Sequence, residues 1–330
     1  MTAANTASAI SAARAPTAKT GARAFARRFF NGDEIARAIV TIAAAVILLV
    51  TLLIVFQLWT KSDAARERFG WGFLTSTTWD PSGEVFGALP FIYGTVVTSA
   101  LALLLAVPIG LGAAIFLSEL APPRMSNALT FLIELLAAVP SVIYGLLGIY
   151  VMVPLLRSSV APVMKSLFGW TPLFSGPFYG YSYFAAGLVL AVMILPFIVS
   201  VSRQILLAVP PEQREGALAL GATQWETTWR VVVPFAKRGI VGSVFLALAR
   251  ALGETMAVTM VVGNTPKIAA SLLGSGYSIA SVVANEFPES AGLHQQALIE
   301  LGLVLFALTI IVNGLARLLV ASTSKMEARA

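Results

Sequence analysis

Six long apolar runs leave this chain few ways to fold. They extend over residues 38–60, 89–118, 128–155, 183–202, 239–262 and 297–320. Each is close to the roughly 20 residues that an α-helix needs to cross the hydrocarbon layer of a membrane. Because lipid offers the backbone no hydrogen bonds, a spanning run of this length must be helical. The sequence therefore predicts an all-α integral membrane protein with six transmembrane helices, in keeping with 58% hydrophobic and 12% charged residues.

The segments outside these runs divide the chain into four predicted regions. Residues 1–35 are rich in Ala, Thr, Ser and Arg, which is typical of a disordered basic tail. Residues 36–90 hold the first span and an outer loop, residues 91–320 form a permease-like core of five spans, and residues 321–330 form a second tail. The first run is too long for a signal peptide and no small-residue cleavage site follows it, so it is predicted to be an uncleaved span.

One apolar segment is predicted not to cross the membrane. Residues 157–181 are interrupted by Pro162, Gly169, Pro172, Gly176 and Pro177, which indicates an outer loop rather than a helix. We expect this loop to lie along the membrane interface, with Trp170 and Tyr179 as anchors.

The distribution of basic residues predicts the orientation of the spans. Most of the 22 Lys and Arg residues lie before the first run, between the fourth and fifth runs, and after the sixth. Positive residues favour the cytoplasmic side, so both termini and the loop at 209–238 are predicted to be cytoplasmic. Since the basic residues are spread between apolar runs, the net charge of +6 indicates contact with membrane lipids and not with nucleic acid.

Several classes of function are disfavoured by composition. The chain has no Cys and one His, which argues against disulfide scaffolds, zinc sites and iron–sulfur clusters. No Gly-x4-Gly-Lys-Ser/Thr phosphate cradle occurs, so the chain is not expected to hydrolyse ATP itself. We predict neither catalytic nor metal-binding residues, and no cofactor in this chain.

A charged pair interrupts the fifth run, GIVGSVFLALARALGETMAVTMVVGN at residues 239–264. At about 1.5 Å of rise per residue, Arg250 lies roughly 16 Å into a hydrocarbon layer of about 30 Å. A charge at that depth costs about 2.5–3.5 kcal/mol and persists when it is paired or lines a wet cavity. Glu254, four residues on, can share its helix face and pair with it. One interpretation is a structural ion pair. The other, which we favour, is a charged binding site on a transport path, because arginine binds an oxyanion with two parallel hydrogen bonds.

The predicted cytoplasmic loop contains signals for two short helices. Pro211 suits a first helical turn, and Gly221 suits the left-handed position that ends a helix. Thr223 and Glu226 have the spacing of a capping box that starts a second helix, which Pro234 is predicted to end. Such a compact helix–turn–helix is interpreted as a docking element, and the alternative is an amphipathic loop on the lipid headgroups.

This loop resembles the EAA loop of ABC importer permeases. The matching positions are Glu215, Gly216, Ala217, Gly221, Val231, Val233 and Pro234. The usual form has Ala, Ile and Leu where this chain has Gly216, Val231 and Val233. The resemblance implies a type I ABC importer permease fold in which cytoplasmic EAA coupling helices insert into a groove of a separate ATPase subunit.

A narrower resemblance connects the chain with the permeases of phosphate ABC importers. It is carried by AVPSVIYGLLG at 138–148, RALGETMAVTMVVGN at 250–264, NTPKI at 264–268 and ANEF at 284–287. It implies a bacterial inner-membrane complex with a PstA-like second permease, a PstB-like ATPase dimer that binds ATP and Mg, and a PstS-like phosphate-binding protein. It also implies a substrate path at Arg250, Glu254 and Thr255, with phosphate as the transported oxyanion.

Other functions remain open at this level. An ABC importer for another oxyanion or small solute would have the same EAA loop. A secondary carrier would also bury charges but would usually show inverted repeats, which we do not find. A channel would move ions in the absence of an ATPase. Further polar residues in or beside the runs (Glu119, Glu134, Ser141, Tyr144 and Asn313) are interpreted as packing residues in preference to path residues.

Overall fold

The computed structural model describes residues 33–327, and the tail predicted at residues 1–35 falls almost entirely outside them. Within 33–327 the chain is helical, with no strand and one isolated bridge between Asp80 and Val85. The α-helices are α2 (Asp33–Lys61), α3 (Asp63–Phe69), α4 (Gly72–Thr75), α5 (Leu89–Ile115), α6 (Pro123–Ala137), α7 (Ser141–Leu147), α8 (Val153–Leu155), α9 (Ala161–Phe168), α10 (Tyr183–Leu207), α11 (Pro211–Ala219), α12 (Gln224–Thr227), α13 (Val233–Leu252), α14 (Met256–Val261), α15 (Ile279–Glu286) and α16 (Gly292–Glu327). The π-helical turns are η1 (Phe116–Leu120), η2 (Gly148–Met152), η3 (Leu156–Val160) and η5 (Thr228–Val232), and the 3₁₀ turns are η4 (Pro172–Phe174) and η6 (Phe287–Glu289).

Six stretches of helix in the described residues are long and apolar enough to cross a membrane, as predicted. They are Glu34–Lys61, Leu89–Leu120, Ser141–Phe168, Tyr183–Leu207, Gln224–Leu252 and Gly292–Leu315. Four of them agree with the predicted spans to within a few residues, and the third and fifth differ. The chain divides into two compact units, Met1–Gln57 and Leu58–Ala330, and the first contains most of α2.

The predicted third span is divided at Pro140. The structure has α6 before this proline and a continuous helical stretch from Ser141 to Phe168 after it. Proline has no N–H, so the carbonyl of Leu136 loses its helical donor, and Pro140 itself is extended, with ψ of 139°. The Tyr144 hydroxyl donates to that carbonyl at 2.7 Å. The break is therefore stabilised from within the same span.

The prediction of a loop at 157–181 is wrong in its first half. Helix continues through η3 and α9 to Phe168, and irregular backbone follows. Pro162 does not break the helix because the π-helical turn η3 directly precedes α9 and accommodates the missing N–H of the proline. Trp170 and Tyr179 are 83% and 72% exposed, and their role as interfacial anchors stays a prediction.

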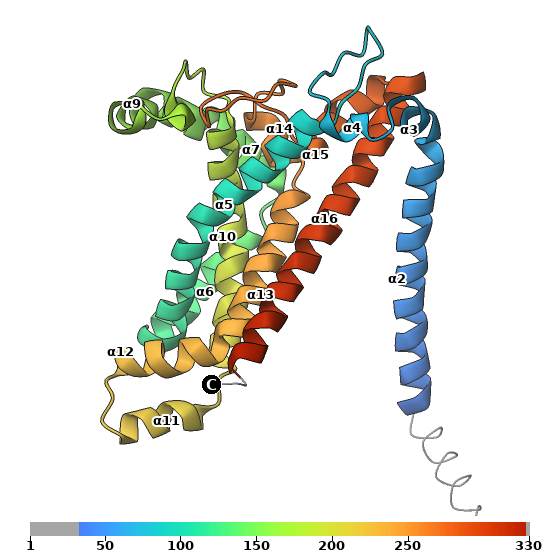
Figure 1. Cartoon of the computed structure of the whole chain (residues 1–330). Coiled ribbons are helices and arrows are strands. Elements are labelled where there is room, and N and C mark those ends of the chain that lie inside the picture. The colour runs from blue at the N-terminus through green and yellow to red at the C-terminus, as the bar shows by residue number, and fades with distance from the viewer. Residues whose placement is uncertain (1–32, 328–330) are drawn as a thin grey trace, which may run out of the picture. The chain divides into compact units, whose positions relative to one another are not determined.

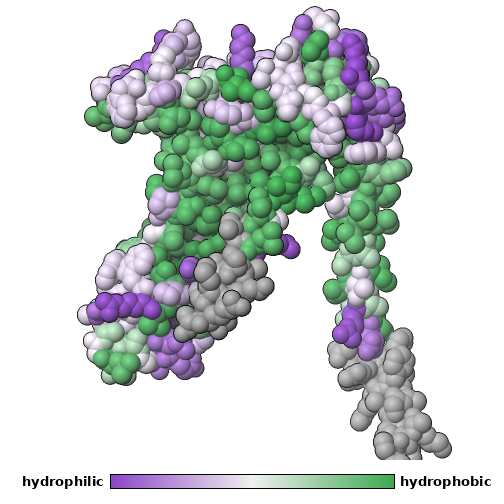
Figure 2. Space-filling model, viewed as in Figure 1, coloured by the Kyte–Doolittle hydropathy of each residue, from purple (hydrophilic) through white to green (hydrophobic). Residues whose placement is uncertain are grey.

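The core of the Leu58–Ala330 unit is built around α10. Its buried side chains, Leu190, Ile194 and Ile198 among them, pack with those of α5, α13 and α14. Figure 1 shows α10 in the middle of this bundle, with α11 and α12 at one end and α9 and α15 at the other. On the visible face, Figure 2 shows hydrophobic residues across the middle of the bundle and more polar residues at both ends. This is the pattern expected of a protein surrounded by lipid.

Candidate functional site

The predicted fifth span is broken just after its arginine. Helix α13 ends at Leu252, and α14 begins at Met256, so Glu254 and Thr255 lie between two helices. Figure 1 shows this break within the bundle and not beyond its end. Discontinuous helices of this kind are the usual way in which transporters bring polar backbone and side chains to the middle of a membrane.

Arg250 and Glu254 do not form the predicted ion pair. The expectation required one continuous helix over both residues, and the helix ends between them. The Glu254 carboxylate instead accepts a hydrogen bond from the backbone N–H of Ala257 at 3.1 Å, in the first turn of α14. Within residues 33–327, no ion pair reaches Arg250, whose side chain is exposed on this chain. The structural-pair interpretation thus loses its geometric basis.

Thr255 lies at the start of the next helix and is half-buried. Its carbonyl accepts from the Thr259 hydroxyl at 2.7 Å and from the Thr259 N–H at 3.0 Å. Its own hydroxyl reaches only the carbonyl of Gly253, at 3.4 Å. That hydroxyl is therefore weakly bound within the chain and can serve a ligand.

A second broken span lies against the first, which the sequence did not reveal. Helix α7, after the break at Pro140, packs on α14, after the break at Glu254. Two glycines make the approach close: a Cβ on Gly145 would collide with Met260, and a Cβ on Gly148 would lie 2.7 Å from Val261. The sequence does contain a signal for this contact: Gly145 and Gly148 follow Pro140 three residues apart, and small residues at such spacing allow close packing of membrane helices.

The loop at residues 209–238, called the coupling loop from here on, has the predicted helix–turn–helix form. Pro211 lies in the first turn of α11, and Gly221 has a φ of +85°. The Gly221 N–H bonds to the carbonyl of Leu218 at 3.0 Å and the Ala222 N–H to that of Ala217 at 3.2 Å. This pair of bonds is the Schellman motif, which ends α11 at a left-handed glycine.

The start of α12 is confirmed, and its predicted end is wrong. The Thr223 hydroxyl accepts from the Glu226 N–H at 3.2 Å, and the Glu226 carboxylate accepts from the Thr223 N–H at 3.0 Å, completing a capping box. Pro234 does not end this helix, which continues through η5 into α13. The wide turn Thr228–Val232 precedes the proline and accommodates its missing N–H. The coupling loop is therefore joined rigidly to the span that carries Arg250.

The outer face of α11 and α12 is exposed and partly apolar. Glu215 and Gly216 are exposed, and Ala217 is half-buried. Exposed apolar side chains in the same segment are Leu218 (49%), Leu220 (91%), Trp225 (57%) and Trp229 (45%). The two tryptophan rings contact each other with centroids 5.6 Å apart. An exposed apolar surface on a short helical hairpin is typical of a protein-docking site.

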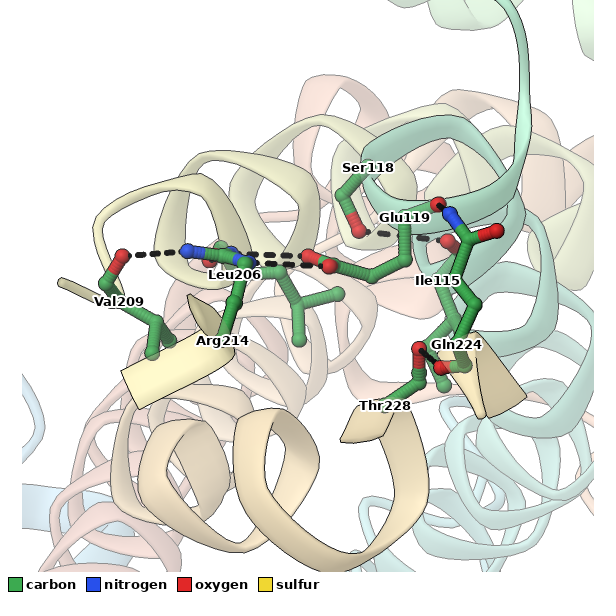
Figure 3. A network of polar contacts seen from close by, with 8 residues as sticks. All are labelled: Ile115, Ser118, Glu119, Leu206, Val209, Arg214, Gln224 and Thr228. Atoms are coloured by element: carbon green, nitrogen blue, oxygen red, sulfur yellow. Dashed lines mark hydrogen bonds and ion pairs between the residues drawn. The ribbon is translucent and has the colours of Figure 1, made fainter. Parts of the chain in front are cut away.

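The inner face of the loop is held by a polar network (Figure 3). Arg214 donates to both carboxylate oxygens of Glu119, at 3.0 and 2.9 Å, and to the carbonyls of Leu206 and Val209, at 2.8 and 2.6 Å. Gln224 donates to the carbonyl of Glu119 at 2.7 Å. Hydrogen bonding to Glu119 raises the pKa of Arg214 above its ordinary value, against desolvation by burial, so the guanidinium stays charged.

Comparisons with known proteins agree with this architecture. The family model described as "Binding-protein-dependent transport system inner membrane component" matches residues 106–325. The phosphate transport system permease protein PstC of Mesorhizobium japonicum is 45% identical over 92% of this chain and 94% of its own length. PstC of Haemophilus influenzae is also 45% identical, over 92% and 98%.

Solved structures show the same fold at low sequence identity. A chain of a bacterial alginate ABC transporter, in complex with a pentasaccharide-bound periplasmic protein, superposes with a TM-score of 0.55. It is 15% identical, with 86% of this chain and 95% of that chain covered. A chain of the MetNI methionine ABC transporter gives a TM-score of 0.50 at 17% identity, covering 71% and 95%. The predicted type I importer permease fold is confirmed.

Proposed function

Because the chain belongs to the family of binding-protein-dependent transport system inner membrane components, we propose that it is the permease subunit of an ATP-driven importer of inorganic phosphate. The observation that carries the choice of substrate is the 45% identity, over nearly the whole chain, to two phosphate transport permeases. Arg250 gives this choice a physical basis, since a guanidinium binds an oxyanion with two parallel hydrogen bonds.

Permeases of this family work with a second permease, an ATPase and a binding protein. For this chain the partners are a PstA-like permease, a PstB-like ATPase dimer that binds ATP and Mg, and a PstS-like phosphate-binding protein. The absence of a nucleotide cradle in the sequence requires that the energy come from a separate subunit. The α11/α12 end faces the cytoplasm in this arrangement, as the basic residues predict.

The ATPase docks on the exposed face of the coupling loop. Glu215, Gly216 and Ala217 lie along α11, and the apolar surface of Leu220 and Trp225 lies beside them. Burial of such side chains yields about 25 cal/mol per Å² of apolar surface removed from water. Gly221 and Pro234 fix where α11 ends and where α13 begins, and so set the angle at which the docking surface is presented.

Arg250 serves phosphate as a transient ligand. Its side chain is exposed on this chain, in the last turn of α13, and a charge that faced lipid at the depth predicted for this residue would cost about 2.5–3.5 kcal/mol. The side chain therefore lies at the interface with the second permease, where the two subunits enclose the path. Thr255 adds a hydroxyl donor, and Glu254 limits the dwell time of the anion by repulsion, because conduction requires weak binding.

Uptake of labelled phosphate tests this function. The chain is expressed with its partner subunits in cells that lack their own phosphate importers, and the complex is isolated in detergent to identify what co-purifies. We expect saturable phosphate uptake, together with an ATPase and a second permease in the isolated complex. Uptake of sulfate or molybdate in place of phosphate would assign another oxyanion, and phosphate uptake by the chain alone would indicate a channel or carrier.

A further inference from the structure

One residue outside the coupling loop contacts both of its helices. Glu119 lies in η1, at the end of the span that begins with α5, and its side chain is 8% exposed. Its carboxylate holds Arg214 of α11, and its carbonyl accepts from Gln224 of α12. Figure 3 shows the Arg214 and Gln224 side chains reaching Glu119 from opposite sides.

Arg214 also connects this residue to the end of α10. Helix α10 ends at Leu207, and its last carbonyls have no donor within the helix. The guanidinium supplies donors to Leu206 and to Val209, the residue just beyond the helix. All three guanidinium nitrogens of Arg214 are thus used. Nε donates to Glu119, Nη1 donates to Val209, and Nη2 donates to both Glu119 and Leu206. A lysine has no planar fork and could not make this set of contacts.

The covalent connections of the loop make Glu119 distinctive. Helix α11 follows α10 along the chain, and α12 runs through η5 into α13, so both spans are joined to the loop by backbone. Helix α5 has no such connection, although it packs along α10 in the core. In the part of the chain that the structure describes, Glu119 accepts side-chain hydrogen bonds from both helices of the loop, from Arg214 and from Gln224.

We propose that Glu119 and Arg214 form a coupling latch that makes α5 move together with the coupling helices when the ATPase closes. This rests on the proposed function. Glu119 is a positioning residue, since it touches neither substrate nor nucleotide but fixes the direction in which force enters α5. A bidentate Arg–carboxylate pair is suited to this role because it resists both stretching and rotation. The loop alone would move α10 and α13, and the latch adds α5 to the helices that move.

The ratio of phosphate transported to ATP hydrolysed tests the latch in reconstituted importer. Glu119→Gln keeps the shape and the backbone carbonyl and removes the charge, while Arg214→Lys keeps the charge and removes the fork. We expect both to retain ATP hydrolysis and to lower the phosphate-to-ATP ratio by about fivefold or more, the range of an allosteric coupling energy. The matched control is Glu84→Gln, which breaks the exposed Arg68–Glu84 pair at 2.8 Å and should leave the ratio unchanged.

A cross-link tests whether the contact between Glu119 and Arg214 transmits motion to α5 or only stabilises the fold. The chain has no Cys, so Glu119→Cys with Arg214→Cys introduces its only two thiols. In complexes whose partner subunits lack cysteine, a bifunctional methanethiosulfonate reagent should raise the phosphate-to-ATP ratio again, and a reductant should reverse this.

Three results would overturn the latch: an unchanged ratio in Glu119→Gln, a parallel fall of hydrolysis and transport at constant ratio, or failure of both single variants to assemble. Failure of the unmodified complex to take up phosphate would instead reject the proposed function.

Discussion

At the scale of single residues, the proposed transport role rests on the charge of Arg250. The side chain is exposed on this chain, and none of the ion pairs among the described residues includes it. Glu254, the expected partner, caps the first turn of α14 instead. Because the Arg250 guanidinium has no ion-pair partner among the described residues, it can bind and release an anion without first breaking an internal ion pair.

Replacing Arg250 tests that role. Arg250→Gln should lower phosphate uptake by about tenfold or more, because charge-assisted hydrogen bonds contribute about 1.5–3 kcal/mol. Assembly with the partners and the melting temperature of the complex should stay unchanged, since no ion pair is broken. Arg250→Lys should give intermediate uptake, because it keeps the charge and loses the fork. A large fall in melting temperature with normal uptake in the surviving complex would restore the structural interpretation.

Gly221 provides a test of the coupling turn. Its φ of +85° is disfavoured for a β-branched residue, so Gly221→Val should strain the turn by about 1–3 kcal/mol. We expect ATP hydrolysis to continue while phosphate uptake falls. The control is Gly314→Ala in α16, away from the loop, at a position where an added Cβ meets nothing within 4 Å. Equal uptake by Gly221→Val and the unmodified complex would remove the turn from the coupling route.

At the scale of helical elements, the central arrangement is the contact between two half-helices. Helix α7 begins after the break at Pro140, α14 begins after the break at Glu254, and the two pack face to face. Small residues allow this approach, as in other membrane helix pairs. The polar break beside Arg250 is thereby held in a fixed place without closing the space around the guanidinium.

The packing on α14 of the helix that begins at Ser141 can be measured through Gly148, the first residue of η2. An added Cβ would lie 2.7 Å from Val261 and 3.0 Å from Val189, so Gly148→Ala should overpack the contact and cost about 1–3 kcal/mol. Gly242→Ala in α13, where nothing lies within 4 Å, should be neutral or slightly stabilising. Thermal unfolding in detergent measures both. A Gly148→Ala variant as stable as Gly242→Ala would contradict the packing described here.

The sequence predicted these elements unequally, for identifiable reasons. Apolar length predicted the number of spans and located four of them, and local turn chemistry correctly placed the end of α11 at Gly221 and the capping box at Thr223. The break after Leu252 was missed because an apolar run does not reveal where its helix stops. The helix through Pro234 was missed because a neighbouring π-turn can absorb a proline. The contacts of Glu119 were beyond reach, since they join residues 95 and 105 positions apart.

At the scale of the whole molecule, the chain is one subunit of a larger transport complex. The docking face of the coupling loop is exposed, and Arg250 faces outward from the bundle. Both features fit the proposed partners, an ATPase at the loop and a second permease at the arginine. The fold joins the loop to the span that carries Arg250 by backbone, through η5 and α13, and joins the loop to the α5 span by side chain, through Glu119.

Phosphate uptake by reconstituted vesicles tests the central claim most directly. The chain, its second permease and the ATPase are placed in liposomes with labelled phosphate and the binding protein outside and ATP inside. We predict accumulation against a gradient that requires ATP, the ATPase and the binding protein, and that is lost in Arg250→Gln while hydrolysis continues. Accumulation without ATP, or full accumulation in Arg250→Gln, would contradict the account.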